Sequence, residues 1–340
     1  MMGSGYWATR YTDDGIPFQV FEGPMPRIDD DVLESCVYLY PTVEDARSGE
    51  RTGGSGLLVG FRADDSLYAI TNSHVIREGR SPVIRLNRTD GRLTVLPISQ
   101  NNWVHHPDGD DLAACSLDLG PEIAYRCIGD TAFCTKGDIQ KYNIGPGDEV
   151  FMIGRFVSHE GKQRNLPSVR FGHIAMLPFE PIRNSRGMLQ EAFLVECRSL
   201  PGYSGSAVFL NPLPLVWANV RKEAQVPIRL LGVDFGHIQE TSFAYDVEES
   251  RNQGRKVLVE PKIGFDMNMG MACVIPAWKI TDLLNVERFV REREKKKSVR
   301  EFDKNASPVS NDIPSKHNTF TKADFEGALR KVSRKIEPER

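Results

Sequence analysis

Short apolar runs separated by turn residues dominate the chain from Cys36 to Trp278. A first group of six runs lies at 36–41, 55–62, 67–75, 83–87, 93–98 and 112–118. After a Gly- and Pro-punctuated connector, a second group of six lies at 148–156, 168–177, 192–200, 204–210, 228–238 and 270–278. Short strands at this spacing, without helical segments between them, are typical of an all-β protein. We therefore expect a double six-stranded antiparallel β-barrel, because closure leaves no long open sheet edge.

The pattern changes at both ends of this region. Residues 1–34 are rich in Gly, Pro and Asp with weak periodicity, which predicts an extended N-terminal arm. After Trp278 the spacing of apolar residues becomes helical, and the sequence then turns strongly charged at 291–297. We expect a domain over 35–290, with barrel one at about 36–118, barrel two at about 148–278 and a helix after it. Residues 291–340 then form a charged linker and a C-terminal helix.

The C-terminal helix is marked by its own periodicity. Thr321 suits the N-cap, and Phe320 and Phe325 take the two positions of a hydrophobic staple. One face of the predicted helix carries Phe325, Ala328, Leu329, Val332 and Ile336. This face either packs on the chain's own barrel or docks a protein partner, and the linker at 303–318 permits both.

Composition narrows the functional classes. The chain has 340 residues, of which 40% are hydrophobic and 26% charged, with a formal net charge of −3. This balance gives no reason to expect a nucleic-acid or membrane partner, and no apolar stretch is long enough to span a bilayer. The six cysteines are scattered without a CxxC pair, so we expect free thiols, no metal and no cofactor. With no apolar leader at the N-terminus, a cytoplasmic location is expected.

The segment PGYSGS at 201–206 raises the question of a nucleophile. Small residues around Ser204 allow the backbone to curl so that the amides of Gly202 and Ser204 point at one spot. Gly205 keeps a side chain away from a bound substrate, and Pro201 stiffens the approach. An acyl-transfer serine also needs a base to take its proton and an acid to orient that base.

Two segments upstream offer those groups. His74 ends the apolar run 67–75, where a barrel strand would meet a loop, and Asp111 directly precedes the run that begins with Leu112. Asp108 and Asp110 compete with Asp111, which is preferred because it alone adjoins the Leu-Ala strand. His105 and His106 suggest a metal cluster instead, but adjacent residues of an extended chain point to opposite sides.

The ordered set of segments resembles a known family. TNSH at 71–74, DLA at 111–113 and PGYSGS at 201–206 occur in the order His, Asp, Ser, and resemble the motifs of trypsin-like, chymotrypsin-fold serine proteases. Within that family, the set of motifs is close in style to bacterial HtrA-like proteases and glutamyl endopeptidases. GDEVFMIG, VRFGHIA, LGVDFG and ACVIP resemble strands of the family's second barrel. The resemblance covers about residues 36–285.

The resemblance implies roles for individual residues. Ser204 would be the nucleophile, His74 the general base and then acid, and Asp111 the residue that orients His74. The amides of Gly202 and Ser204 would form the oxyanion hole. Tyr203 stands where secreted digestive relatives carry Asp, so activation by pairing that Asp with a new N-terminus is not expected.

Substrate preference is weakly encoded. The resemblance places Arg198 at the base of the pocket for the residue preceding the cleaved bond, where an inward-pointing Arg would favour an acidic side chain. The nearby Glu196 could neutralise it. Asp234 and His237 lie on the strand that would line the cleft, and Asp234 favours a basic side chain instead. The resemblance thus implies a serine endopeptidase acting on proteins or peptides. The alternatives are a catalytically silent module used for binding in a multi-protein bacterial system, and an α/β-hydrolase esterase, which the order Ser, Asp, His of that family disfavours.

Overall fold

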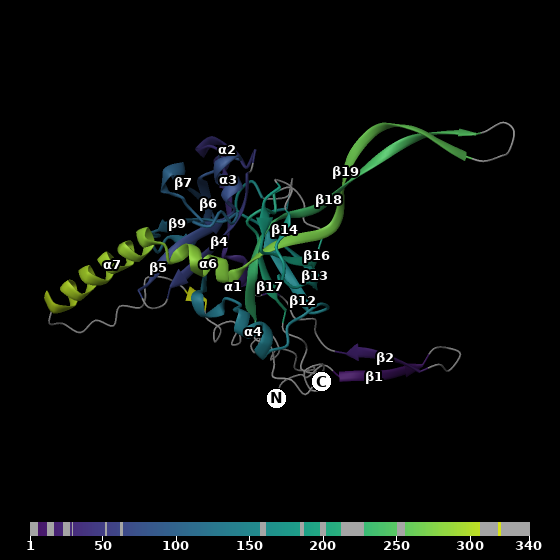
Figure 1. The fold of residues 1–340 in the computed structure, drawn as a ribbon. Coiled ribbons are helices and arrows are strands. Elements are labelled where there is room, and N and C mark those ends of the chain that lie inside the picture. The colour runs from purple at the N-terminus through teal and green to yellow at the C-terminus, as the bar shows by residue number, and fades with distance from the viewer. Residues whose placement is uncertain are drawn as a thin grey trace.

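The computed structural model describes most of the chain. The described residues are 6–11, 17–22, 28, 30–51, 53–61, 64–156, 161–183, 187–197, 202–211, 228–249, 256–306 and 319–320. Within them the chain forms two adjacent β-sheet bodies followed by helices (Figure 1). The expected all-β architecture of two bodies with C-terminal helices is confirmed, and the second body is a closed six-stranded barrel.

The first body is a largely antiparallel sheet whose neighbours run in the order β10-β6-β3-β4-β5-β9-β8. Its strands are β3 (Cys36–Tyr40), β4 (Gly54–Phe61), β5 (Ser66–Thr71), β6 (Val83–Arg88), β7 (Leu93–Leu96), β8 (Val104–His105), β9 (Ala113–Leu117), β10 (Ile123–Ala124) and β11 (Cys127–Gly129). β7 pairs with β6, and β11 joins the far end of β4 in parallel. All six runs of the first group form strands, but hydrogen bonds between the described strands leave this sheet open.

The second body is a closed barrel with the strand order β12-β13-β16-β19-β18-β17. Its strands are β12 (Glu149–Gly154), β13 (Ser168–Met176), β16 (Phe193–Glu196), β17 (Ala207–Leu210), β18 (Arg229–Glu249) and β19 (Lys256–Pro276). A small separate hairpin, β14 (Ile182–Arg183) and β15 (Leu189–Gln190), lies between β13 and β16. Each run of the second group therefore supplies one barrel strand.

Both faces of several strands are buried, which explains why their sequences are apolar runs rather than alternating patterns. In β3, Val37 and Leu39 join the core inside the first body, whereas Tyr38 and Tyr40 join a core cluster shared by both bodies. In β12, Phe151 belongs to the shared cluster, and its neighbours along the strand line the second barrel. Because side chains alternate along a strand, one face fills a barrel and the other holds the two bodies together.

The hairpin of β18 and β19 is much longer than the sequence pattern predicts. The two strands pair from Gly232 opposite Pro276 to Glu249 opposite Lys256. The proximal part closes the barrel, and the distal part projects away from it as a two-stranded ribbon (Figure 1). The predicted strands 228–238 and 270–278 thus correspond only to the barrel portion.

The segments outside the barrels also differ from expectation. The predicted extended arm contains a hairpin, β1 (Tyr6–Tyr11) with β2 (Pro17–Glu22), and a short helix α1 (Asp30–Leu33). The connector before β12 holds the 3-10 turn η2 (Asp130–Ala132) and the helix α4 (Lys136–Lys141), which begins with a capping box at Thr135 and Asp138. The remaining short elements are α2 (Val43–Ser48), α3 (Ser73–Arg77) and the 3-10 turn η1 (Gln100–Asn102).

Two helices follow the barrels, α6 (Ala277–Leu284) and α7 (Glu287–Ala306). α6 buries Ala277, Ile280, Leu283 and Leu284 in the shared core. α7 is fastened at its start, where Phe289 is fully buried with its ring centroid 5.0 Å from that of Tyr68. The helix then projects from the molecule (Figure 1).

The predicted C-terminal helix from Thr321 lies outside the described residues. Just before it, β20 (Thr319–Phe320) pairs in parallel with β11, so Phe320 is in a strand here. No helix among the described residues is long and apolar enough to cross a bilayer. All six cysteines are free and buried.

Candidate active site

His74 and Asp111 form the centre of the site, although they lie 37 residues apart in sequence. His74 Nδ1 is 2.6 Å from Asp111 Oδ2, and the backbone N–H of His74 donates to Asp111 Oδ1 at 2.8 Å. The Asp111 side chain is 2% exposed and that of His74 16%. A buried carboxylate that accepts two hydrogen bonds from one residue fixes both the backbone and the ring of that residue.

The sequence analysis placed His74 at the end of a strand, and the structure corrects this. β5 ends at Thr71, and His74 lies in the first turn of the short helix α3. The first backbone N–H groups of a helix have no partner within it. Asp111 accepts one of them, so its carboxylate caps α3 from a distant segment while it holds the imidazole.

The residues before His74 complete this attachment. Asn72 occupies the N-cap position of α3, yet its side chain makes no capping hydrogen bond. Its Nδ2 instead donates to the backbone oxygen of Asp111 at 3.0 Å. Thr71 donates from Oγ1 to the backbone oxygen of Ser55 at 2.7 Å. Ser73 Oγ also lies 2.8 Å from His105 Nδ1. Every residue of TNSH therefore contacts a neighbouring strand or loop.

The loop carrying Ser204 docks on β4 of the first body. The Ser204 backbone oxygen accepts from the N–H of Ser55 at 2.8 Å. A Cβ added to Gly54 would lie 2.9 Å from that same oxygen and 3.0 Å from Val75 Cγ2. Val75 follows His74 in α3, so the Ser204 backbone and α3 both pack against Gly54 of β4.

Ser55 also fixes the loop through its hydroxyl. Ser55 Oγ donates to the backbone oxygen of Gly202 at 3.0 Å and accepts from the backbone N–H of Arg155 at 2.9 Å. Gly202 and Gly205 adopt positive φ values of 94° and 89°, which bend the chain sharply on both sides of Ser204. This backbone curl around the serine is the shape that the sequence PGYSGS predicts.

Tyr203 anchors the loop from the other side. It is fully buried, and its hydroxyl lies 2.5 Å from Ser168 Oγ and accepts from Arg170 Nε at 2.9 Å. The Arg170 guanidinium also stacks 4.8 Å from the centre of the Tyr203 ring. The phenol of Tyr203 therefore ties the loop to β13.

The three predicted pocket residues have different environments. Asp234 is completely buried, and its backbone oxygen accepts from the N–H of Gly205 at 2.8 Å. His237 lies on β18 opposite Ala272, and partial burial lowers its pKa. Arg198 lies outside the described residues. Asp234 thus adjoins the Ser204 loop through its backbone, and no charged pocket is defined by these positions.

The HHPDGDD segment does not assemble a metal site. His105 turns toward Ser73, whereas His106 Nδ1 lies 3.3 Å from Asp110 Oδ2. Burial lowers the pKa of both imidazoles. Among the described residues, no group of three or more His, Cys, Asp or Glu side chains is arranged to hold a metal ion.

Several residues that build the site were not predicted. Ser55, Asn72 and Gln190 each bond directly to a site segment, and all three are at most 2% exposed. The signal for Ser55 and Asn72 is present in the sequence, because each is a polar residue inside or directly after an apolar strand. Such a residue is buried and must find a hydrogen-bond partner. Gln190 lies in a two-residue strand that carries no comparable pattern.

Comparison with known proteins gives a fold likeness only. No family model matches the chain, and no curated protein matches it. Among solved structures, the HtrA-type protease AlgW, determined with a decapeptide, is 19% identical with a TM-score of 0.38, covering 70% of this chain and 53% of its own. The Rv3671c protease of M. tuberculosis in an inactive form is 13% identical with a TM-score of 0.40, covering 74% and 88%. Deg5 is 18% identical with a TM-score of 0.35, covering 61% and 81%.

The chain spans only 53% of the AlgW chain, and the identities and TM-scores are low. No activity, substrate or partner is transferred from them to this chain. The functional conclusion depends on the site geometry of the chain itself.

Proposed function

We propose that the chain is a serine endopeptidase that hydrolyses peptide bonds through Ser204, His74 and Asp111. The observation that carries this proposal is the contact of 2.6 Å between His74 Nδ1 and the buried carboxylate of Asp111. A buried acid that accepts from one imidazole nitrogen leaves the other nitrogen free to act as a base. The Ser204 loop, bent by two glycines, docks beside the helix that carries this imidazole.

The proposed reaction has two stages. Ser204 Oγ attacks the carbonyl carbon of the substrate while His74 Nε2 takes the hydroxyl proton. The resulting oxyanion accepts hydrogen bonds from the amides of Gly202 and Ser204. Collapse breaks the C–N bond, and His74 gives the proton to the leaving amine, which leaves an ester on Ser204. Water, deprotonated by His74, then attacks that ester and releases the acid and the free serine.

Fluorophosphonate labelling tests the nucleophile directly. The reagent phosphonylates a serine only when a base activates it, so we expect one adduct per folded chain, mapped by mass spectrometry to Ser204. The Ser204→Ala variant should fold and carry no adduct. If folded wild-type protein remains unlabelled, the silent binding module is the better assignment. Cleavage of a peptide library by wild type but not by Ser204→Ala would distinguish a peptidase from an esterase and define substrate preference.

A second prediction concerns the oxyanion hole. Ser55→Ala removes the hydroxyl that holds the Gly202 carbonyl and receives the Arg155 amide. We expect the rate of fluorophosphonate labelling to fall by about tenfold, because misplaced donors stabilise the oxyanion less. We also expect the free energy of unfolding to fall by about 1–3 kcal/mol, because a buried carbonyl and amide lose their partner.

The matched control is Ser35→Ala, which removes another buried hydroxyl hydrogen bond, to Val32 at 2.7 Å, in the same body. It should cost comparable stability and leave the labelling rate unchanged. Equal labelling rates for Ser55→Ala and wild type would show that Ser55 does not position the loop.

A further inference from the structure

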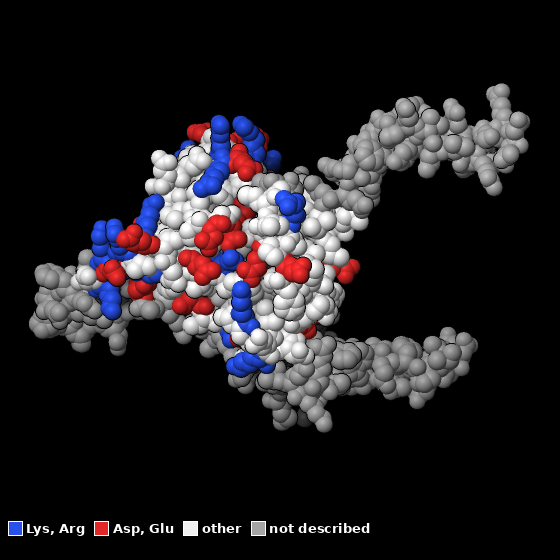
Figure 2. Space-filling view, in the orientation of Figure 1, with Lys and Arg blue, Asp and Glu red and all other residues white. Residues whose placement is uncertain are grey.

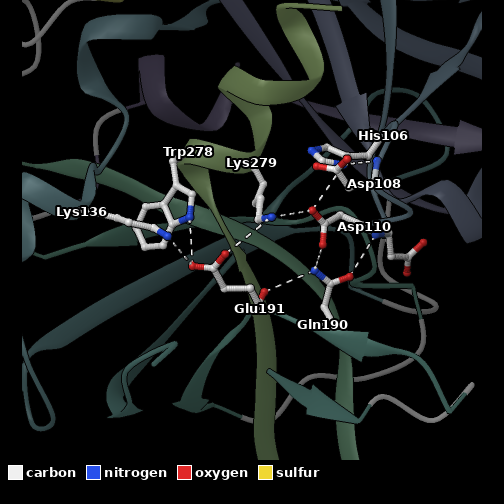
Figure 3. A network of polar contacts seen from close by, with 9 residues as sticks. His106, Asp108, Asp110, Lys136, Gln190, Glu191, Trp278 and Lys279 are labelled. Carbon is white, nitrogen blue, oxygen red and sulfur yellow. Dashed lines mark hydrogen bonds and ion pairs between the residues drawn. The ribbon is translucent and has the colours of Figure 1, made fainter. Parts of the chain in front are cut away.

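A polar network joins the loop at 106–111 to β15, α4 and α6 (Figure 3). Its central residue is Gln190, which is 2% exposed and comes from β15, the hairpin strand that leads into β16 of the second body. Gln190 Oε1 accepts from the backbone N–H of Asp111 at 3.1 Å, and Gln190 Nε2 donates to Asp110 Oδ1 at 2.6 Å. The two ends of one buried carboxamide thus hold two consecutive residues of the loop that carries the acid.

The far side of Asp110 is held by α6. Lys279 Nζ lies 2.9 Å from Asp110 Oδ2 and 3.6 Å from Glu191 Oε2. Burial alone would lower the pKa of Lys279, but the carboxylates around it raise that pKa above its usual value. Acidic side chains gather over the middle of the face shown in Figure 2. The carboxylates that raise the pKa of Lys279 belong to Asp110, Glu191 and Asp282. The lysine therefore stays charged and paired.

Glu191 extends the network to the indole and to α4. Glu191 Oε1 accepts from Trp278 Nε1 at 3.2 Å and lies 3.2 Å from Lys136 Nζ. Lys136 also lies 5.3 Å from the centre of the Trp278 ring. Asp110 is consequently held between Gln190 and a lysine that is itself fixed by a second carboxylate.

The carboxamide of Gln190 matches the hydrogen-bonding needs of both residues that it contacts. The site requires an acceptor toward the Asp111 amide and a donor toward the Asp110 carboxylate, which a carboxamide supplies from two adjacent atoms. A buried polar group that is satisfied at both ends is rigid. Gln190 therefore restrains the backbone of segment 110–111, and with it the Asp111 carboxylate that contacts His74.

We propose that Gln190 is a positioning residue for Asp111, so that the second body fixes the acid of the catalytic pair that the first body carries. This inference rests on the proposed function and names the residue that orients its acid. Gln190 touches neither the substrate nor the reacting atoms, and acts only through Asp111.

The test separates positioning from plain stabilisation. Gln190→Met keeps the length of the side chain and removes its hydrogen bonds to Asp110 and Asp111, together with the one that Nε2 donates to the Glu191 backbone oxygen at 3.3 Å. We expect kcat to fall by about tenfold to a hundredfold with KM changed less than about twofold, because a small displacement of an orienting group weakens catalysis rather than binding. In proton NMR spectra of the free protein, the downfield resonance of the His74 Nδ1 proton should move upfield.

A polarity swap guards against loss of folding. Gln190→Glu alone places a second carboxylate against Asp110 and should be impaired. The double variant Gln190→Glu/Asp110→Asn reverses the donor and acceptor between the two positions, keeps an acceptor for the Asp111 amide and keeps an oxygen for Lys279. We expect it to recover kcat to within about threefold of wild type, together with the downfield resonance.

Asn165→Leu serves as the stability control, because Asn165 is another carboxamide that is 2% exposed, and its side chain bonds to Arg85 rather than to the loop of Asp110 and Asp111. It should lower the melting temperature and leave the His74 resonance in place. If Gln190→Met also lowers only the melting temperature, or if the swap recovers nothing over Gln190→Glu, the proposal is wrong. The resonance is read without substrate, so a wild type that resists fluorophosphonate labelling would overturn the proposed function and leave this test standing.

Discussion

Replacing Asp111 with asparagine is expected to lower kcat/KM by about ten-thousandfold while leaving the fold intact. The reason lies in the two hydrogen bonds that the carboxylate accepts from His74. The backbone N–H of His74, which donates to Oδ1 at 2.8 Å, can only donate. An asparagine must therefore turn its oxygen toward this amide.

Its NH2 group then faces the imidazole, in place of the oxygen that lies 2.6 Å from Nδ1. Nδ1 must become an acceptor, and the ring proton moves to Nε2. A ring protonated at Nε2 cannot take a proton from Ser204. The variant should keep substrate binding and lose the proton transfer, so KM should change little and kcat should carry the loss.

The measurement is kcat/KM on a cleaved peptide, or the labelling rate with a fluorophosphonate, for wild type and variant. Asp108→Asn is the matched control, because it makes the same chemical change three residues away, and it keeps the backbone amide through which Asp108 donates to His106 Nδ1. That variant should retain wild-type rates. If Asp108→Asn lowered the rate as much as Asp111→Asn, the assignment of Asp111 as the residue that orients His74 would be wrong.

Much of the architecture could be predicted because the strands are buried on both faces. Runs such as Cys36–Tyr40 are continuous apolar segments, and their lengths and spacing identify them as strands. The long β18–β19 ribbon could not be predicted in this way, because outside the barrel its residues mix charged and apolar types. The helix α3 was missed for a related reason: it has only five residues, too few to show a helical period after the apolar run of β5.

In the candidate site, too, some residues could be predicted from the sequence and others could not. The residue types of His74, Asp111 and Ser204 are visible in motifs, because each occurs in a short segment of small or turn-forming residues. The supporting residues are visible only in three dimensions. Ser55 lies 147 residues from the Gly202 carbonyl that it holds, and Gln190 lies 79 residues from the Asp111 amide. Pairings at such separations depend on how the two bodies meet, which no local pattern encodes.

Gly205 lies where the Ser204 loop of the second body contacts β4 of the first, and we expect Gly205→Ala to be severely destabilising. A Cβ at this position would lie 1.9 Å from the backbone oxygen of Ser55 and 2.5 Å from Thr71 Oγ1. These two atoms are already joined by a hydrogen bond of 2.7 Å, so neither can retreat without breaking a contact between β4 and β5. The positive φ of 89° adds the cost that any side chain meets in this conformation.

Gly91→Ala separates the two costs. Gly91 has a similar φ of 82°, but a Cβ there would meet nothing within 4 Å. We expect about 1 kcal/mol of destabilisation at Gly91 from the backbone alone, and at least about 3 kcal/mol at Gly205, where steric overlap is added. Urea unfolding followed by tryptophan fluorescence measures both. Fluorophosphonate labelling should persist in Gly91→Ala and disappear in the folded fraction of Gly205→Ala. The hydrogen bond from the Gly205 amide to the Asp234 backbone oxygen and the one from the Ser55 amide to the Ser204 backbone oxygen both require Gly205 to lie close to β4. Equal stability of the two variants would mean that the Ser204 loop does not lie against β4, and the site would lose the contact that brings its serine to the body that carries its histidine.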